Sequence, residues 1–290
     1  MTATGAKGSS PHLITGGAGP VMLIGGAEDK RRDKAILSRF VRFAGGAEAS
    51  IVVISTASTL GDMATQIYRE LFEGLGVARV TGIRPEDRDQ ADDPEVAAPL
   101  ADATGVFLTG GNQLRLSSAV GGTRLASALF LAHDRGAVIA GTSAGASALA
   151  SHMMAFGTPG PTPKNRMAQL SAGLGLLDRI VIDQHFEQRG RIGRLLSVIA
   201  HSPSLLGLGL DEDTAAIVYA DKVMEVVGRG AVTIVDGSRA RTDAYQGKGH
   251  RPLMVSGVVL HSLPAGYWFD LRARTLLPGA VRGEEREASE

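Results

Sequence analysis

A serine set between two glycines, directly after an apolar run, could carry nucleophilic chemistry. Residues 141–145 read Gly-Thr-Ser-Ala-Gly and follow the apolar run 136–140. A buried strand, a G-x-S-x-G turn and small helix-forming residues are the pattern of a nucleophile elbow. The glycines are needed because a side chain there would collide with the neighbouring strand or helix. The helix start would offer N–H groups and positive potential to an oxyanion. We therefore predict a serine hydrolase with Ser143 as its nucleophile.

A serine nucleophile needs a base within hydrogen-bond reach and an acid that orients this base. Among the seven histidines, His185 follows the apolar run 180–182 and two polar residues, at the carboxyl end of a predicted strand. It directly precedes a predicted helix. Catalytic groups of parallel sheets gather at such strand ends. We therefore predict His185 as the base; the alternative is a structural histidine bonded to the backbone.

Three consecutive acids, Asp211, Glu212 and Asp213, lie between two apolar runs and could supply the orienting carboxylate. Adjacent carboxylates repel one another, so at least one should face solvent or pair with a cation. The cluster could also hold a hard cation, or form an ordinary polar turn. The spacing does not choose among the three acids.

Stabilising an oxyanion requires two aimed donors. The N–H of Ala144, directly after the nucleophile, is the first. Gly111 is predicted as the second, because a glycine lets the backbone approach a substrate closely, although Gly110-Gly111 is also typical of a simple turn.

Basic residues follow His185 closely. Arg191 and Arg194 are three residues apart on the predicted helix 189–199, so they can face the same way. Together they could bind a substrate carboxylate through paired hydrogen bonds. The alternative is a solvated helix face.

Short apolar runs alternate with helical patterns through the first half of the chain, which predicts a parallel sheet covered on both faces. Strands are expected at 21–24, 50–55, 78–83, 105–109 and 137–140, and helices at 33–45, 62–75, 92–103 and 112–133. Four glycine-rich strand ends should converge on one edge. The loop 158–163 is expected beside the site as a lid. From residue 205 the pattern is β-rich and predicts an antiparallel extension of the same sheet.

Composition excludes several classes of protein. The 290 residues are 44% hydrophobic and 21% charged, with 30 basic and 30 acidic residues. A net charge of zero gives no reason to expect binding to nucleic acid or to a membrane surface. The absence of cysteine excludes disulfides and thiolate sites. No secretory signal or membrane span is evident, so a cytoplasmic location is expected.

The predicted organisation is a flexible segment at 1–19, a single α/β hydrolytic domain at 20–282 and a flexible tail at 283–290. The fold class is α/β, with a mostly parallel central sheet flanked by helices and a β-rich C-terminal extension.

Several segments together resemble the cyanophycinase family, in order from about residue 21 to 260. The matching stretches are Leu-Ile-Gly-Gly-Ala-Glu-Asp-Lys at 23–30, Leu-Thr-Gly-Gly-Asn-Gln-Leu at 108–114, Gly-Thr-Ser-Ala-Gly-Ala at 141–146, Asp-Gln-His-Phe at 183–186 with Gln-Arg-Gly-Arg at 188–191, and Gly-Leu-Asp-Glu-Asp-Thr-Ala at 209–215. This resemblance implies a fold similar to class I glutamine amidotransferases (flavodoxin-like). It also implies a serine-type exopeptidase that digests cyanophycin, a poly-aspartate backbone with an arginine on each β-carboxyl, to β-Asp-Arg dipeptides. It further implies a homodimer, and the acyl-enzyme chemistry expected here requires no metal or organic cofactor.

The resemblance also implies roles for individual residues. Ser143 would be the nucleophile, His185 the general base and acid, and Glu212 the orienting carboxylate. The substrate pocket would contain Gln113, Gln184, Arg189 and Arg191. The family commonly has aspartate where this chain has Asn112, which removes a charge near the pocket.

Two rival functions are compatible with these motifs. One is an aspartyl or isoaspartyl dipeptidase on the same scaffold. The other is a binding or regulatory protein without catalysis, which the presence of all three triad residues disfavours.

Overall fold

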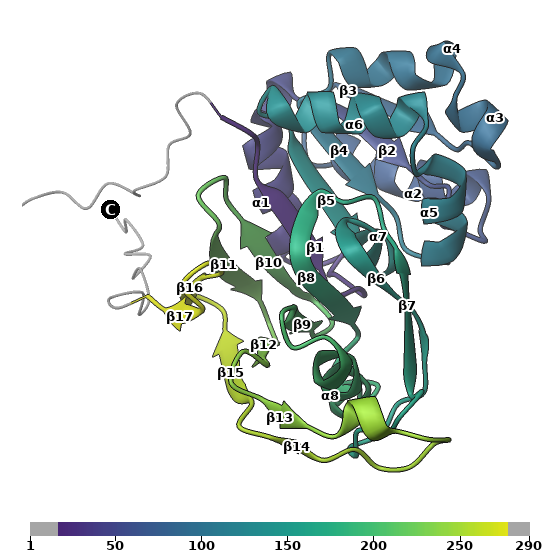
Figure 1. Ribbon diagram of the computed structural model, residues 1–290. Helices are drawn as coiled ribbons and strands as arrows, with labels where there is room; N and C mark the ends of the chain where they lie inside the picture. Colours follow the sequence, from purple (N-terminus) through teal and green to yellow (C-terminus); the bar gives the residue numbers. More distant parts are fainter. Residues whose placement is uncertain (1–16, 278–290) are drawn as a thin grey trace, which may run out of the picture.

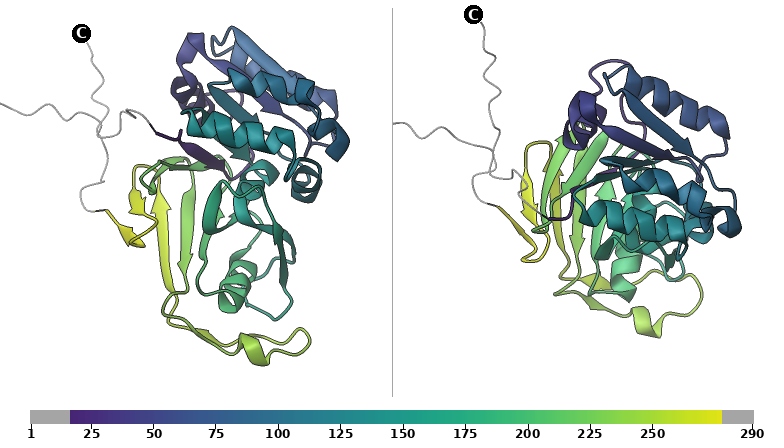
Figure 2. Two further views of the ribbon diagram at one scale, coloured as in Figure 1. Left: turned by 45° about the horizontal axis from the view of Figure 1, so that its top comes forward. Right: turned by 90° about the horizontal axis from the view of Figure 1, so that it is seen from above.

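The computed structural model describes residues 17–277, whose strands form a nine-stranded sheet, a six-stranded sheet and a two-stranded ribbon. Figure 1 shows a helix-rich amino-terminal part beside a β-rich remainder, and Figure 2 shows the same arrangement from two further directions. Among the described residues, no helix combines the length and the apolar character needed to span a bilayer.

The nine-stranded sheet has a parallel half and an antiparallel half, in the order β17-β16-β11-β10-β1-β5-β4-β2-β3. The parallel strands are β1 (Val21–Ile24), β2 (Ser50–Ile54), β3 (Arg79–Ile83), β4 (Gly105–Leu108) and β5 (Val138–Thr142). The antiparallel strands are β10 (Thr214–Val218), β11 (Val223–Gly228), β16 (Trp268–Asp270) and β17 (Thr275–Leu276).

Helices cover both faces of the parallel half, which explains why its central strands are apolar throughout. On one face, α1 (Ala35–Ala44) and α2 (Asp62–Glu73) bury a cluster that includes Phe40, Phe72 and Phe107. The other face packs against α5 (Gln113–Val120), α6 (Arg124–Asp134) and α7 (Ala144–Ala148).

The second sheet has the order β15-β12-β9-β8-β6-β7. Its strands are β6 (Ala150–Gly157), β7 (Ala168–Ala172), β8 (Leu177–Gln184), β9 (Leu206–Leu210), β12 (Ala231–Asp236) and β15 (Val259–Pro264). One face joins the core of the nine-stranded sheet through residues such as Ile182 and Leu208. The other face is covered by α8 (Ile192–His201), whose Leu195 and Val198 share a buried cluster with Met154. The ribbon comprises β13 (Arg241–Thr242) and β14 (Val255–Ser256).

The sequence predicts that the β-rich region extends a single sheet, but the structure divides its strands between two sheets. That prediction holds for β10 and β11, which continue the first sheet, but it is wrong for β9, β12 and β15, which join the second. The apolar periodicity of a strand identifies its buried faces but not the neighbour with which it pairs.

Several predicted boundaries also differ. The helix expected at 92–103 is broken into α4 (Pro94–Ala97) and a 3-10 turn at 98–101, following α3 (Arg88–Ala91). Proline, which lacks an N–H, favours such breaks. The helix expected at 112–133 is interrupted at Gly121 and Gly122, and the one expected from 189 begins at Ile192. Strands β6 and β7 were not predicted.

Parts of the predicted terminal segments lie outside the described residues, namely 1–16 at one end and the whole of 283–290 at the other. Within the described part, Gly19 is buried and its N–H donates to the carbonyl of His133 at 2.8 Å.

Candidate active site

Ser143 occupies a strained turn between β5 and α7, as the sequence pattern predicts. Its φ is 52°, a left-handed value that is rare for residues other than glycine. A Cβ on Gly141 would lie 2.4 Å from the backbone carbon of Gly145, and one on Gly145 would lie 2.4 Å from the carbonyl oxygen of Leu108. Both flanking positions therefore require glycine.

Three side chains that are distant in sequence form one hydrogen-bonded relay. The Oγ atom of Ser143 lies 2.8 Å from Nε2 of His185, and Nδ1 of His185 lies 2.7 Å from Oε1 of Glu212. An ionised carboxylate only accepts hydrogen bonds. The ring therefore carries its hydrogen on Nδ1 and leaves Nε2 free to accept from the serine hydroxyl.

The topology explains why these groups meet. Strands β8 and β9 are parallel neighbours in the second sheet, so their carboxyl ends, which precede His185 and Glu212, lie together. Strands β1 and β5 are parallel neighbours in the first sheet, which brings Gly25 beside Ser143. The two edges are joined where the N–H of His185 donates to the carbonyl of Gly25 at 2.9 Å. The site therefore lies at the junction of two sheets.

The three consecutive acids have different partners. Asp211 is buried and accepts from the N–H groups of Glu187 and Ala231. Asp213 lies 3.2 Å from the guanidinium of Arg229, which agrees with the expectation that at least one acid pairs with a cation. Only Glu212 reaches His185, and Oε1 of Gln188 accepts its backbone N–H at 2.9 Å.

The surroundings of His185 favour the neutral ring. Burial lowers the pKa of His185 below its usual 6.5, and the positive charges of Arg189 and Arg191 lower it further, while the hydrogen bond and negative charge of Glu212 oppose this shift. A neutral imidazole is the form that can take a proton.

The two predicted oxyanion donors flank Ser143. Ala144 is the first residue of α7, so its N–H has no acceptor inside the helix. Gly111 adopts a φ of 142° and packs so closely on Ala57 that a Cβ would lie 2.0 Å from the Ala57 carbonyl oxygen. A Cβ on Gly110 would lie 3.3 Å from that of Ser143, so this turn runs directly beside Ser143.

A hollow of about 480 Å³ opens beside Ser143 and contains all four residues that the resemblance assigned to substrate binding: Gln113, Gln184, Arg189 and Arg191. Of these, Arg189 is exposed and Gln184 is buried. The side-chain amide of Gln113 donates to the carbonyls of Met154 and Ala155, which ties α5 to β6. The loop 158–163 also lies beside this region, since Gly160 and Gly190 are hydrogen bonded at 2.9 Å.

Asp183 is a buried carboxylate that positions two of these arginines. The sequence assigned it no role. Asp183 is fully buried and pairs with Arg194 through both carboxylate oxygens and with Arg191 at 3.3 Å. The two arginines do face the same way, but they are buried on this aspartate rather than on a solvated helix face. Burial lowers the pKa of Arg191 to about 10, so it remains charged at neutral pH. Of the arginines that line the hollow, Arg189 has no such counter-ion among the described residues.

A second buried carboxylate, that of Glu28, is hydrogen bonded to the residue before Ser143. Glu28 is 3% exposed and accepts hydrogen bonds from Thr142 at 2.6 Å, from Tyr68 at 2.5 Å and from Lys30 at 2.7 Å. Burial, followed by the charge of Glu28, raises the pKa of Tyr68 well above 10, so the phenol stays a donor. Thr142 directly precedes Ser143, so this cluster fixes the start of the turn.

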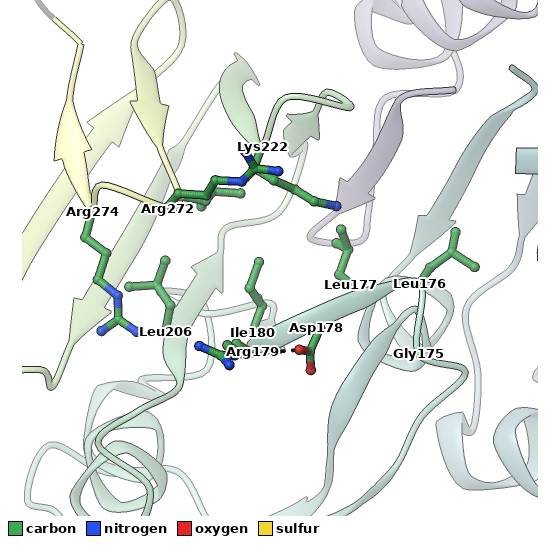
Figure 3. Close-up of a pocket in the computed structure, with 11 residues that line it drawn as sticks. Gly175, Leu176, Leu177, Asp178, Arg179, Ile180, Leu206, Lys222, Arg272 and Arg274 are labelled. Carbon is green, nitrogen blue, oxygen red and sulfur yellow. Dashed lines mark ion pairs between the residues drawn. The ribbon is translucent and has the colours of Figure 1, made fainter. Parts of the chain in front are cut away.

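Another hollow, of about 450 Å³, lies near the amino end of β8 and contains none of the predicted site residues (Figure 3). It is surrounded by Leu177, Leu206 and basic side chains that include Lys222 and Arg272. His185 follows the opposite end of β8, roughly 20 Å away at the rise of an extended strand.

Comparisons with known proteins agree with one another. The family model described as peptidase family S51 matches residues 21–226. The chain is 39% identical over 265 residues to a cyanophycinase from Trichormus variabilis, covering 90% of this chain and 89% of the relative. It is 40% identical over 266 residues to a cyanophycinase from Synechococcus elongatus, covering 90% and 82%.

Solved structures share the fold. A peptidase from an acI-B1 Actinobacterium superposes with a TM-score of 0.63 at 21% identity, covering 84% of this chain and 98% of that one. A putative peptidase E protein from Listeria monocytogenes gives 0.51 at 15% identity, covering 73% and 98%. At such identities the likeness concerns the fold alone.

Proposed function

The chain belongs to peptidase family S51 and is a serine-type peptidase, and on this premise we propose that it degrades cyanophycin as an exopeptidase and releases β-Asp-Arg dipeptides. The observation that carries the substrate is the match to cyanophycinases over 90% of the chain. The relay of Ser143, His185 and Glu212 supports the chemistry.

In the first step, Oγ of Ser143 attacks the carbonyl carbon of a backbone amide in the poly-aspartate chain. Nε2 of His185 takes the hydroxyl proton, and Glu212 stabilises the resulting imidazolium through Nδ1. The carbonyl oxygen becomes negative and accepts hydrogen bonds from the N–H groups of Ala144 and Gly111.

In the second step, the tetrahedral intermediate collapses and the carbon–nitrogen bond breaks. His185 gives its proton to the leaving amine, and an ester on Ser143 remains. Water then loses a proton to His185 and attacks this ester, and the proton returns to Oγ of Ser143. Water is the only co-reactant of the cycle, and all protons pass between Ser143, His185, the leaving amine and water.

The substrate carries a free carboxylate on every arginine. Arg189 and Arg191 line the hollow and would attract such carboxylates. Gln113 and Gln184 would complete the pocket. Asn112 caps α5 by accepting from the N–H groups of Leu114 and Arg115, a role that aspartate would also fill.

A homodimer in the cytoplasm remains a proposal that follows from the resemblance and from the composition. Size-exclusion chromatography with light scattering tests the assembly state directly.

Mass spectrometry of the products formed by purified protein from cyanophycin tests the function. We expect β-Asp-Arg dipeptides to accumulate, and small α-Asp dipeptides to be poor substrates in parallel reactions. A protein that spared the polymer and cleaved α-Asp dipeptides would instead be an aspartyl dipeptidase.

A further inference from the structure

Phe156 is an exposed aromatic residue at the rim of the candidate site. The chain has eight phenylalanines, all in the described part, and seven of them are buried or half-buried. Phe156 is 61% exposed and lines the hollow that contains Ser143. A single exposed apolar side chain needs no explanation by itself, but this ring lies at the edge of the hollow that contains Ser143.

A β-bulge directs the Phe156 side chain outward. Along the β6–β7 ladder, Met154 pairs with Leu170 and Phe156 pairs with Gln169, so Ala155 is an extra residue. In an unbroken ladder, Phe156 would share the face on which Met154 packs beneath α8, because side chains alternate. Bulges recur beside active sites, where they redirect a side chain.

The bulge is hydrogen bonded to Gln113, a residue that lines the same hollow as Ser143. Both carbonyls at the bulge, those of Met154 and Ala155, accept from the side-chain amide of Gln113 at 2.9 and 3.1 Å. Gln113 begins α5, two residues after the predicted oxyanion donor Gly111. The position of Phe156 is therefore coupled to the elements that frame Ser143.

Phe156 also joins two hollows. The first is the one of about 480 Å³ that contains Ser143, and the second, of about 370 Å³, adjoins it at Phe156 and Gly157. The titratable side chains of the first hollow are three arginines, and those of the second are Arg166 and His250. Among the described residues, no acid lines either hollow: Asp183, which pairs with Arg191 and Arg194, is fully buried, and Glu212 is engaged by His185.

The positive charges of these arginines suit the carboxylates of cyanophycin but repel its guanidinium groups. The face of an aromatic ring attracts a cation through its quadrupole. Elsewhere the chain forms such a contact itself, because the guanidinium of Arg39 lies 5.2 Å from the centroid of the Phe43 ring. Among the described residues, no ring or cation occupies the face of Phe156.

We propose that Phe156 is a specificity-determining residue whose ring stacks on the guanidinium of a substrate arginine, while the neighbouring arginines bind the carboxylates. This inference rests on the proposed function and extends it. It explains how a site lined by cations accepts a substrate whose every repeat also carries a cation.

The test compares two short β-linked substrates, one bearing arginine and one bearing citrulline, the neutral isostere of arginine. Phe156→Leu keeps an apolar side chain but removes the ring, Phe156→Tyr keeps the ring, and Leu131→Ala on α6 is a control with a side chain of similar exposure, 60%. We expect Phe156→Leu to lower kcat/KM for the arginine substrate by about 3- to 20-fold, mainly through KM. Its effect on the citrulline substrate should be less than about twofold, and Phe156→Tyr should retain wild-type selectivity.

An equal loss on both substrates, or no loss on the arginine substrate, would overturn the inference while the proposed function stood. If the wild-type protein released nothing from the arginine substrate, the proposed function itself would fail. Unchanged melting temperatures for the variants would exclude unfolding as the cause of any loss.

Discussion

The backbone of Gly26 packs directly against the imidazole of His185. A Cβ on Gly26 would lie 2.4 Å from Cε1 of the ring, and Gly26 has a φ of +102°. A side chain at position 26 could not occupy this space unless the ring moved. The backbone of Gly26 therefore keeps His185, the proposed base, in line with Ser143.

Gly26→Ala should therefore displace His185 and reduce kcat. A displacement of about 1 Å from a reactive geometry lowers the rate by about 100-fold. Gly76→Ala is a matched control, since Gly76 has a φ of +88° but nothing within 4 Å of its Cβ position. Activity and melting temperature are measured for both. If both variants lost activity equally, backbone strain rather than displacement of His185 would be responsible.

Glu212→Gln should impair proton transfer from Ser143 to His185, although glutamine has nearly the same size and shape as glutamate. A glutamine amide can donate to Nδ1 and so stabilise the tautomer that cannot accept the serine proton. The expected loss is about 10²- to 10⁴-fold in kcat, by analogy with the orienting acids of other triads. Asp211 and Asp213 have other partners, so Asp213→Asn is the control and should retain most activity. A Glu212→Gln variant with wild-type kcat would contradict the assignment.

The pH profile should depend on Arg189. Burial is the main cause of the lowered pKa of His185, and the charge of Arg189 contributes in the same direction. Because the neutral ring is the active form, kcat/KM should fall as the pH drops through this pKa, at a value below 6.5. Removing the cation in Arg189→Gln raises the pKa, so the acidic limb should move to higher pH. Arg42→Gln, on α1, should leave the limb in place, and an unmoved limb in Arg189→Gln would refute the electrostatic coupling.

Thr142→Val should destabilise the elbow. The substitution removes the hydroxyl that donates to Glu28 and leaves a buried carboxylate oxygen without that donor. The expected loss of stability is about 1–3 kcal/mol, measured by chemical denaturation together with kcat. Thr142→Ser keeps the hydroxyl and should restore most of both quantities. If valine changed neither, the Glu28 cluster would have no part in positioning Ser143.

Local signals identified the first sheet and the elbow. The apolar strands β1, β2, β4 and β5 are buried on both faces, so their runs stand out in the sequence. The turn around Ser143 was recognisable because its glycines are each required by a backbone contact at 2.4 Å.

The second sheet was harder to predict because its order depends on contacts between distant segments. Strand β6 follows α7 after one residue and contains a bulge, so its apolar residues do not alternate regularly. Strands β8 and β9 pair in parallel through the crossover helix α8, but they belong to the second sheet rather than to the first. No periodicity within either strand specifies this neighbour.

The candidate site was predictable in part. His185 stood out by its place at a strand end, but the choice of Glu212 over Asp211 and Asp213 came from the family resemblance. Asp183 and Glu28 lie within the family motifs, but the sequence assigns them no role, because burial of a carboxylate among distant donors is visible only in three dimensions. Phe156 gave no signal, since its exposure depends on the bulge at Ala155.

Attack of Ser143 on the polymer is tested most directly by the release of β-Asp-Arg from cyanophycin by the wild-type protein and by Ser143→Ala. We expect steady release by the wild type and a loss of about 10⁴- to 10⁶-fold in the variant, whose fold should be intact by circular dichroism. Undiminished dipeptide release by Ser143→Ala would contradict this role of Ser143.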